Sequence, residues 1–359
     1  MSMHGRPFAT RMPQPVRRPA RLVSLVPLVL ILAPAAAAAA PLQDALRAYG
    51  VQAEHIGRLW NFTLGLCALV FALVLAAFVC ALWSARRGDA HTEPDISSLA
   101  RPERGIYRII AWAVGISTVG LLALLGADVV TSRALARMPL QDAVNIELIG
   151  HQWWWEARYK DADPARQFTT ANELHIPVGR PVVVTLRSND VIHTLWLPNL
   201  HGKRDMIPGR TSTLTFRADQ PGTYRGQCAE FCGLEHAMMA LLVVAEPDAQ
   251  YQAWAARQRQ PAPEPATSRT RRGREVFLGK SCAMCHAIGG TTANAVFGPD
   301  LTHLAGRGTI ASGMLPNNRG HLGGWISDPQ TLKPGVSMPA NLMPQEDLHA
   351  LLDYLETLK

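Results

Sequence analysis

The sequence predicts a multidomain membrane protein with two transmembrane α-helices in a hairpin, an all-β sandwich and an all-α C-terminal unit. Three observations lead there: two long uncharged apolar runs, a series of short β-rich runs after them, and a last stretch with helical ends and Gly/Pro-rich loops. Hydrophobic residues make up 48% of the 359 residues, and charged residues make up 18%. This charged share is low for a soluble chain, and the composition excludes a disordered protein. At about 150 residues per domain the length predicts two or three units.

The net charge of +7 does not indicate nucleic-acid binding. Residues 1–40 contain no acidic residue and five arginines: Arg6, Arg11, Arg17, Arg18 and Arg21. Subtracting these five charges from +7 leaves +2 for the rest of the chain. The same segment continues with an apolar stretch (22–32) and a run of small residues (33–40), which is the layout of a signal peptide. We predict a signal peptide over residues 1–40, with an alanine-rich anchor or a disordered tail as the alternative.

Two membrane spans, at about 59–83 and 106–130, are predicted within residues 41–135. Residues 59–83 carry no charge, and 25 residues of helix extend over roughly 37 Å, more than the hydrocarbon core of a bilayer. Trp60 and Trp83 lie at the two ends of this run, where indole rings prefer the membrane interface. Cys67 and Cys80 fall inside the first span and are interpreted as apolar packing residues.

The orientation of the two spans in the membrane follows from the charged residues between them. This connection contains five arginines: Arg86, Arg87, Arg101, Arg104 and Arg108. Short loops rich in Arg and Lys stay in the cytoplasm. We therefore predict a cytoplasmic connection, with the N-terminus of the mature chain and everything after the second span on the outer side.

After the second span the pattern changes to short β-rich runs separated by Gly, Pro and Asp. These runs are 144–149, 173–176, 182–186, 212–217 and 239–244, and they predict a sandwich or small barrel over residues 140–246. Residues 247–268 are predicted to form an extended linker because Pro261, Pro263 and Pro265 alternate with other residues. Residues 269–359 form the last unit.

The first chemical site is Cys228-Ala-Glu-Phe-Cys-Gly-Leu-Glu-His-Ala-Met-Met239. Thiolate, thioether and imidazole ligands select copper or zinc. A disulfide and a zinc site of two Cys and two His are the alternatives, but a weak methionine ligand favours copper. Two thiolates can bridge two copper ions, and each ion then needs its own histidine. The second histidine is expected upstream, at His193, with His201 as a substitute.

Residues 41–248 resemble subunit II of the haem–copper respiratory oxidases, in which a binuclear CuA cupredoxin domain follows two membrane helices. The matching stretches occur in the family's order: Gly-His-Gln-Trp-Trp-Trp at 150–155, Asp-Val-Ile-His at 190–193, Lys-Arg-Asp-Met-Ile-Pro-Gly-Arg at 203–210, and 228–239. Quinol-oxidising relatives lack the copper ligands, so the resemblance implies the branch that oxidises cytochrome c.

The resemblance also implies roles for single residues. Cys228 and Cys232 would bridge the coppers, with further ligands from the side chains of His193, His236 and Met239 and the backbone carbonyl of Glu230. The Glu230 side chain would bind magnesium at the boundary with subunit I. Trp153 matches a surface tryptophan through which electrons enter, and Glu103 lies near the position of a glutamate at a proton-channel mouth, although its surroundings match the family poorly.

The second chemical site is Cys282-Ala-Met-Cys285-His286, the attachment sequence of a c-type haem. A redox Cys-x-x-Cys with an incidental histidine is the alternative. Candidate sixth ligands of the iron are Met314, Met338, Met343, His303, His321 and His349.

Residues 269–359 resemble a class I cytochrome c, through the haem attachment sequence, Gly-Pro-Asp-Leu at 298–301, Met338-Pro339 and a terminal helix at 345–358. The resemblance implies that Cys282 and Cys285 hold the haem covalently and that His286 and Met338 are its axial ligands. It also implies that Pro299 supports the histidine side.

Together these features predict the electron-entry subunit of a cytochrome c oxidase, an oxidoreductase and translocase of a bacterial plasma membrane whose oxygen-reducing site is on another subunit. Electrons would pass from cytochrome c to haem c, then to CuA and subunit I, coupled to proton translocation. Expected partners are subunit I, other oxidase subunits, a cytochrome c donor and lipid, and no nucleic acid. The alternatives are the electron-input subunit of a CuA-containing nitric oxide reductase and a membrane-anchored electron carrier without a catalytic partner.

Overall fold

The computed structural model describes residues 43–85, 88, 91, 96 and 103–359. The expected signal peptide lies outside these residues, as do Arg86, Arg87 and Arg101 of the expected cytoplasmic connection. Residues Pro41–Lys359 form one compact unit.

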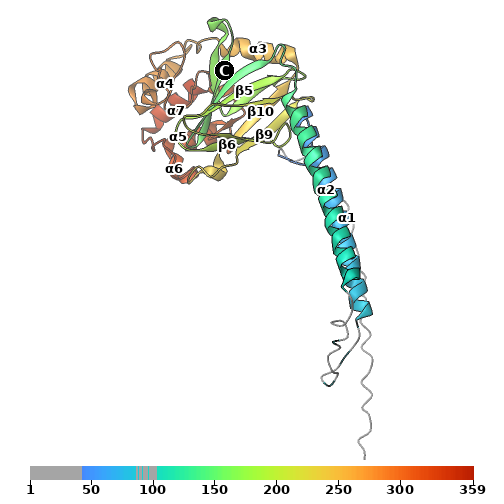
Figure 1. Ribbon diagram of the computed structural model, residues 1–359. Helices are drawn as coiled ribbons and strands as arrows, with labels where there is room; N and C mark the ends of the chain where they lie inside the picture. The colour runs from blue at the N-terminus through green and yellow to red at the C-terminus, as the bar shows by residue number, and fades with distance from the viewer. Residues whose placement is uncertain (1–42, 86–87, 89–90, 92–95, 97–102) are drawn as a thin grey trace, which may run out of the picture. The chain divides into compact units, whose positions relative to one another are not determined.

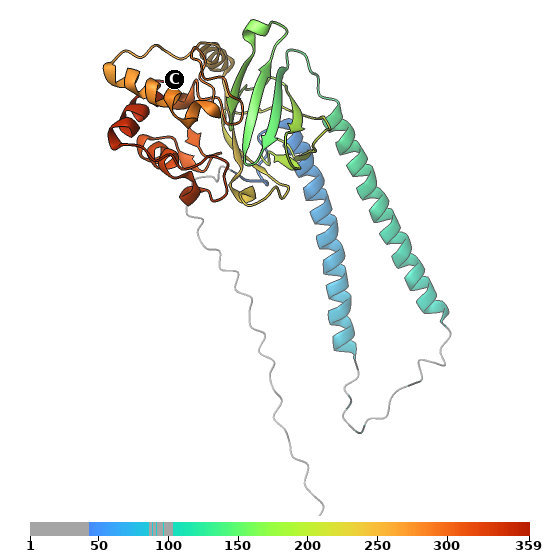
Figure 2. The ribbon, with the colours of Figure 1, turned by 90° about the vertical axis from the view of Figure 1, so that its left-hand side faces the viewer.

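Two long helices, α1 (Val51–Ser84) and α2 (Arg104–Ala136), contain the two uncharged runs (Figure 1). Both are long and apolar enough to cross a membrane, and none of the residues in the most apolar window of either is buried inside the protein. Figure 2 shows both helices extending from the same side of the sandwich. A soluble helix would bury one apolar stripe against a core, whereas these helices expose apolar side chains all round.

The first turn of α1 is anchored to the β domain. Gln52 is buried, its Oε1 accepts a hydrogen bond from the Arg217 backbone N–H at 3.2 Å, and Gly50 forms a β-bridge with Ala218. A Cβ at Gly50 would lie 2.4 Å from the Arg217 carbonyl oxygen, so only glycine allows this approach. The membrane helix and the sandwich are therefore joined by a packed contact in addition to the chain itself.

The middle of the chain is a sandwich of two five-stranded sheets. The first has the order β3 (Phe168–Ala171), β2 (Trp154–Lys160), β1 (Val144–His151), β5 (Val182–Ser188), β8 (Ser212–Phe216). The second has the order β4 (Glu173–Pro177), β10 (Ala240–Glu246), β9 (Gly222–Cys228), β6 (His193–Trp196), β7 (Lys203–Met206). The β1–β5 and β4–β10 pairs are parallel and the others antiparallel.

Alternating apolar residues fill the space between the sheets. In β5, Val182, Val184 and Leu186 are fully buried while the residues between them are partly exposed, because successive side chains of a strand point to opposite faces. Trp155 and Phe216 are among the largest fully buried side chains. The expected β sandwich is confirmed.

The expected extended linker is wrong in its first half. Residues Asp248–Gln258 form helix α3, which buries Tyr251, Trp254 and Ala255 on the sandwich core. These three positions follow helical spacing, and the ring of Trp254 stacks on His175 with centroids 4.2 Å apart. The prolines that suggested an extended chain all follow Gln258, so they do not oppose a helix before it.

The C-terminal unit is helical, apart from the two-residue strands β11 (Thr309–Ile310) and β12 (Leu315–Pro316). Its helices are α4 (Ser268–Gly279), α5 (Arg319–Ser327), α6 (Pro329–Leu332) and α7 (Gln345–Leu355). Helices α4 and α7 meet at Gly273, where a Cβ would lie 2.0 Å from the Ala350 carbonyl oxygen. Phe277, Leu351 and Tyr354 belong to the core that this contact closes.

Candidate metal centre and haem site

The residues expected to bind copper converge at one end of the sandwich. The Cys228 Sγ lies 3.8 Å from the Cys232 Sγ and 3.8 Å from the His193 Nδ1. It also lies 3.3 Å from the Glu230 backbone oxygen. The ligand atoms of His193, Cys228 and Cys232 all lie within 4.8 Å of one another.

The second cysteine has a matching set of neighbours. The Cys232 Sγ is 3.6 Å from the His236 Nδ1 and 3.9 Å from the Met239 Sδ. Each thiol therefore has one imidazole and one weaker donor beside it. This arrangement suits a pair of soft metal ions bridged by two thiolates.

Strand pairing brings these distant residues together. His193 begins β6 and Cys228 ends β9, and the two strands pair with Leu195 opposite Cys228. The loop from β9 to β10 then supplies Cys232, His236 and Met239. Of this set, His193 and Met239 are 0% exposed and each cysteine is 2% exposed, so the protein itself excludes water from most of the site.

The orientation of His193 is fixed on two sides. Its Nε2 lies 2.8 Å from the Asp190 Oδ1, and its ring packs against Gly150, where a Cβ would come within 2.8 Å of it. Burial lowers the pKa of His193, but the Asp190 and Cys228 interactions outweigh this and leave the pKa raised. Asp190 is the partner that keeps the Nδ1 directed at the thiols, as is common around metal-binding histidines.

The two thiols influence each other's protonation. The hydrogen bond between them lowers the pKa of Cys228 and, together with burial, raises the pKa of Cys232. A dication between the sulfurs would favour the thiolate form of both. Both cysteines are free thiols, so the structure does not contain the disulfide that the sequence left open.

The haem attachment residues lie at the start of the C-terminal unit. Cys282 is in a short 3₁₀ turn (Ser281–Met284) and Cys285 follows it directly. The His286 Nδ1 lies 2.7 Å from the Pro299 carbonyl oxygen, as the resemblance to cytochromes c implies, and this leaves Nε2 for a metal ion. The ring also lies over Gly298, where a Cβ would approach it to 2.7 Å. Burial lowers the pKa of His286, which favours the neutral, metal-binding imidazole.

Met338 is held in a loop that Gln330 fixes. The Gln330 Nε2 donates to the carbonyl oxygens of Val336 at 2.7 Å and Met338 at 2.8 Å. Met338 packs against the same core as Cys282. Among the alternatives, His303 is buried, with its two ring nitrogens 2.8 Å from the Lys359 oxygen and 3.1 Å from the Gln260 oxygen, so its nitrogens already have partners.

Comparisons with known proteins find relatives of both domains. Residues 162–246 match the family model described as the periplasmic domain of cytochrome c oxidase subunit II, and residues 270–359 match that of cytochrome c. A cytochrome c oxidase subunit 2 from Alkalihalophilus pseudofirmus is 36% identical over 323 residues, covering 88% of this chain and 90% of the relative. The chain belongs to the cytochrome c oxidase subunit II family.

Two further proteins are similar to this chain. A cytochrome c oxidase subunit 2 from Bacillus sp. strain PS3 is 30% identical over 268 residues, covering 70% of this chain and 74% of the relative. The crystal structure of the periplasmic domain of subunit II from Bradyrhizobium japonicum is 29% identical and covers 33% of this chain and 96% of that domain, with a TM-score of 0.31. The two family models and the Alkalihalophilus relative show that the chain is a subunit II with a cytochrome c domain fused on its C-terminal side.

Within this subunit II, Trp153 is more buried than the resemblance implied. It is 8% exposed, and its indole Nε1 donates to the Cys232 carbonyl oxygen at 3.0 Å. Its own carbonyl oxygen accepts hydrogen bonds from Ser312 and Lys333 of the cytochrome c domain. Trp154 is less buried and stacks on His151 with centroids 4.4 Å apart.

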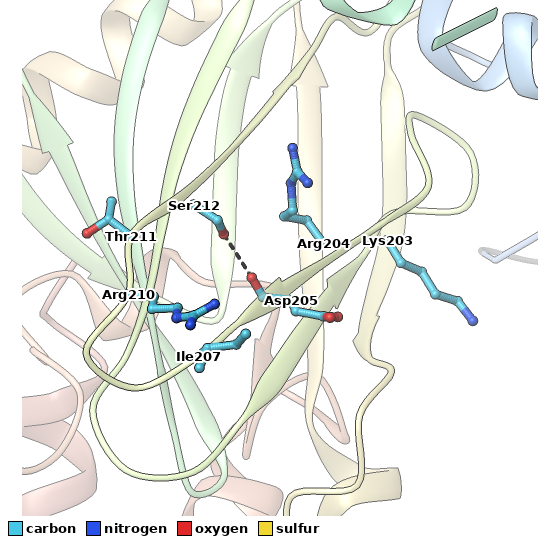
Figure 3. Close-up of a pocket in the computed structure, with 7 residues that line it drawn as sticks. All are labelled: Lys203, Arg204, Asp205, Ile207, Arg210, Thr211 and Ser212. Carbon is cyan, nitrogen blue, oxygen red and sulfur yellow. Dashed lines mark hydrogen bonds between the residues drawn. The ribbon is translucent and has the colours of Figure 1, made fainter. Parts of the chain in front are cut away.

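The matching stretch 203–210 forms an open pocket of about 390 Å³ (Figure 3). Seven residues line it: Lys203, Arg204, Asp205, Ile207, Arg210, Thr211 and Ser212. The Ser212 Oγ donates to the Asp205 backbone oxygen at 2.8 Å, and the Asp205 carboxylate accepts from Thr194, next to His193, at 2.7 Å. The stretch therefore supports the strand that begins with His193.

Two further expected residues lie away from both sites. The Nδ1 of His201 accepts from the Gly202 N–H at 2.6 Å, and burial with nearby Arg204 lowers the pKa of His201 to about 4. His201 is therefore not the second imidazole. Glu103 is an exposed residue at the start of α2.

Sequence reasoning did not assign roles to Asp190, Gln330 or Lys333. Asp190 has a sequence signal, because it lies three residues before a predicted ligand within a matching stretch. The other two are polar residues in a Pro/Gly-rich segment, and no local pattern distinguishes them from solvated ones.

Proposed function

We propose that this chain receives electrons from an external cytochrome c on a covalent haem c and passes them through a binuclear CuA centre to the oxygen-reducing haem–copper site of subunit I, coupled to proton translocation. The observation that carries the proposal is the convergence of His193, Cys228 and Cys232 within 4.8 Å. The neighbouring His236 and Met239 complete a ligand set of thiolate, imidazole and thioether. Both cofactors would supply reversible one-electron transfer when bound.

In the proposed copper centre, Cys228 and Cys232 would hold both ions, and His193 and His236 would hold one ion each. Met239 and the Glu230 backbone oxygen would be the weak ligands. Most of these side chains are buried, and the centre would supply electron transfer rather than chemistry on a substrate.

In the proposed haem site, Cys282 and Cys285 would hold the haem covalently. His286 and Met338 would hold its iron, and this pair of ligands would give a high reduction potential. The Pro299 oxygen orients the His286 ring, and the Gln330 side chain orients the Met338 backbone.

Trp153 is proposed as the electron-entry residue of the copper centre. Its hydrogen bond to the Cys232 carbonyl links the indole to a bridging ligand in one step. The variant Trp153→Phe keeps an aromatic ring and removes this donor. Slower electron transfer from haem to copper, with unchanged metal spectra, would support the role; unchanged transfer would contradict it.

Further proposals concern the boundary with the membrane complex. The exposed Glu230 carboxylate would bind magnesium against subunit I, and Glu103 would lie at a proton-channel mouth. Residues 1–40 would be a signal peptide, residues 41–135 the membrane hairpin, and residues 140–246 and 269–359 the two outer domains, at the plasma membrane of a bacterium. Two span-length helices and a domain matching a periplasmic family model support this topology.

Metal and optical analysis of the purified complex tests the function. We expect copper, one c-type haem per chain, and the haem groups of subunit I in a complex that consumes oxygen with reduced cytochrome c. Copper without a copurifying subunit I would indicate a free electron carrier. Nitric oxide consumption without oxygen consumption would indicate the electron-input subunit of a CuA-containing nitric oxide reductase.

A further inference from the structure

Lys333 is a fully buried lysine where the cytochrome c domain meets the sandwich. It is 1% exposed, and its Nζ donates to the carbonyl oxygens of Trp153 and Met238, each at 2.9 Å. Both acceptors belong to the sandwich, whereas Lys333 directly follows α6 of the cytochrome c domain. A buried ammonium group is costly unless it is hydrogen-bonded, so this contact depends on the two domains being docked.

The hairpin of β11 and β12, together with Gly308 just before it, makes further hydrogen bonds between the cytochrome c domain and the sandwich. The Ser312 Oγ donates to the Trp153 carbonyl oxygen at 2.8 Å, and the Ser312 oxygen accepts from the Ala240 N–H of β10 at 3.1 Å. The Gly308 N–H donates to the Glu173 carboxylate at 3.1 Å. The Trp153 carbonyl thus receives two donors from the cytochrome c domain, on separate segments.

The donors and acceptors of this contact lie close in the chain to residues of the two proposed redox centres. Lys333 begins the loop that ends at Met338, and Gln330 holds that loop through the Gly335 N–H and the Met338 oxygen. On the other side, Met238 precedes the proposed copper ligand Met239, and the Trp153 indole donates to the Cys232 oxygen. The hydrogen bonds of Lys333 therefore hold the loop that ends at Met338 against the loop between β9 and β10.

We propose that Lys333 is a positioning residue whose buried ammonium group docks the cytochrome c domain on the copper domain and so sets the geometry of internal electron transfer. The electron-transfer part of this inference rests on the proposed function, whereas the docking part does not. Trp153 is the shared element, because its carbonyl receives the docking donors while its indole contacts the copper loop.

The electrostatic surroundings support a charged lysine. Burial lowers the pKa of Lys333 to about 8, and the negative charge of Glu235 opposes that shift. Glu235 is itself buried at 5% exposure, and its Oε2 has no hydrogen-bond partner among the described residues. A cation from one domain therefore lies near a buried anion of the other.

The variant Lys333→Met tests the docking in the full-length chain within the oxidase complex. Hydrogen exchange is read at the Ala240 and Gly308 amides, whose hydrogen bonds cross the interface. We expect their exchange to accelerate about tenfold or more, because hydrogen bonds to a charged group are among the stronger ones. The Leu242 and Leu301 amides bond within their own domains and should keep their protection.

Two further variants separate docking from folding and from charge. Ser312→Ala removes the other donor to the Trp153 carbonyl and should accelerate exchange at Ala240 by a smaller factor. Arg271→Met removes the same charge from an exposed position on α4 and should leave exchange unchanged. If Lys333→Met unfolds the cytochrome c domain, protection at Leu301 is lost, and Ser312→Ala then decides the docking role.

Electron transfer from photoreduced haem to copper is measured in the same proteins. We expect it to slow in Lys333→Met while the haem spectrum, copper resonance and both potentials stay as in the wild type. Unchanged exchange at Ala240 and Gly308 would overturn the docking role. Faster exchange with unchanged transfer would overturn the positioning role. Absence of copper from the wild-type complex would defeat the proposed function instead, and the exchange result would still decide the docking.

Discussion

The proposed copper ligands and the proposed haem ligands differ in how far the polypeptide buries them. His193, Cys228, Cys232 and Met239 are between 0% and 2% exposed and lie at the ends of paired strands or in the loop between β9 and β10. The residues of the haem site are only partly buried: Cys282, Cys285, His286 and Met338. They lie in loops and short turns rather than in the helices that form the core of that domain.

The two domains also differ in the size of the core that the polypeptide forms, so we expect them to depend on their cofactors to different degrees. The sandwich core consists mainly of residues that bind no metal, such as Trp155 and Phe216, and it also includes Cys228, Cys232 and Met239. The cytochrome c domain has fewer than a hundred residues, and a chain of that size forms a limited core of its own. A covalent haem would add a large apolar surface for Met338 and the attachment segment to pack on, so we expect the haem to be a structural part of that domain.

Preventing haem attachment should give the largest effect. In Cys282→Ser/Cys285→Ser we expect the cytochrome c domain to lose about 4 kcal/mol or more of stability, because a tightly bound cofactor stabilises only the folded state. Cys228→Ser should abolish the copper centre but cost the sandwich at most about 2 kcal/mol. Domain-resolved hydrogen exchange measures both. Unfolding of the sandwich upon copper loss would contradict the comparison.

The axial methionine of the haem should give the next largest effect. Met338→Ala removes the proposed sixth ligand, and we expect the weak sulfur-to-iron absorption at the red end of the visible spectrum to vanish. The haem should stay covalently attached, so a denaturing gel stained for haem serves as the control. Persistence of the band would transfer the role to Met314 or Met343.

The corresponding methionine of the copper centre should matter less. In Met239→Leu we expect both copper ions to remain, because two thiolates and two imidazoles still bind them, while the potential and the mixed-valence resonance change. Leucine keeps a similar volume in this fully buried position. Loss of copper from a folded protein would show that Met239 is more than a weak ligand.

The sequence indicates a candidate site most directly where the ligand residues are close together in the chain. Cys228 to Met239 and Cys282 to His286 carry nearly complete ligand sets within a few residues, so their spacing alone indicates the metal chemistry. His193 lies 35 residues before Cys228 in the chain. Its place in the site depends on the pairing of β6 with β9, so the sequence could offer His193 only as a candidate beside His201, and the family resemblance supported His193.

The sequence is silent where the fold decides the environment. The short strand β7 is polar, with Lys203, Arg204 and Asp205 before Met206, and no alternation of apolar residues marks it. Helix α3 was missed because prolines that follow it dominate the composition of the segment. Lys333 lies between Leu332 and Pro334 like an ordinary loop lysine, and only the docking of two domains buries it.

The smallest predicted effect compares a buried carboxylate of the sandwich with a carboxylate of the cytochrome c domain whose cationic partner is exposed. Glu156 of β2 is 6% exposed and accepts a hydrogen bond from Arg158 at 2.7 Å, with His151 at 3.2 Å. Asp347 of α7 pairs with Arg272 at 2.8 Å, and the arginine side chain is 56% exposed. Exposed pairs of this kind contribute little to stability.

Burial raises the pKa of Glu156, but the hydrogen bonds from His151 and Arg158 and the charge of Arg158 outweigh it, so the folded-state pKa is lowered. A carboxylate with a lowered folded-state pKa stabilises the fold above its unfolded pKa, and this contribution is lost as the pH falls towards the folded-state value. We therefore expect Glu156→Gln to cost the sandwich about 1 kcal/mol at neutral pH, and the difference from the wild type to shrink below about pH 4.5. Denaturant unfolding of both proteins across this range measures it. Asp347→Asn is the control for a pair with an exposed arginine, and its effect should be smaller at neutral pH. A Glu156→Gln deficit that stayed constant down to the lowest pH would mean that packing rather than charge is responsible, since the packing of a glutamine side chain does not titrate.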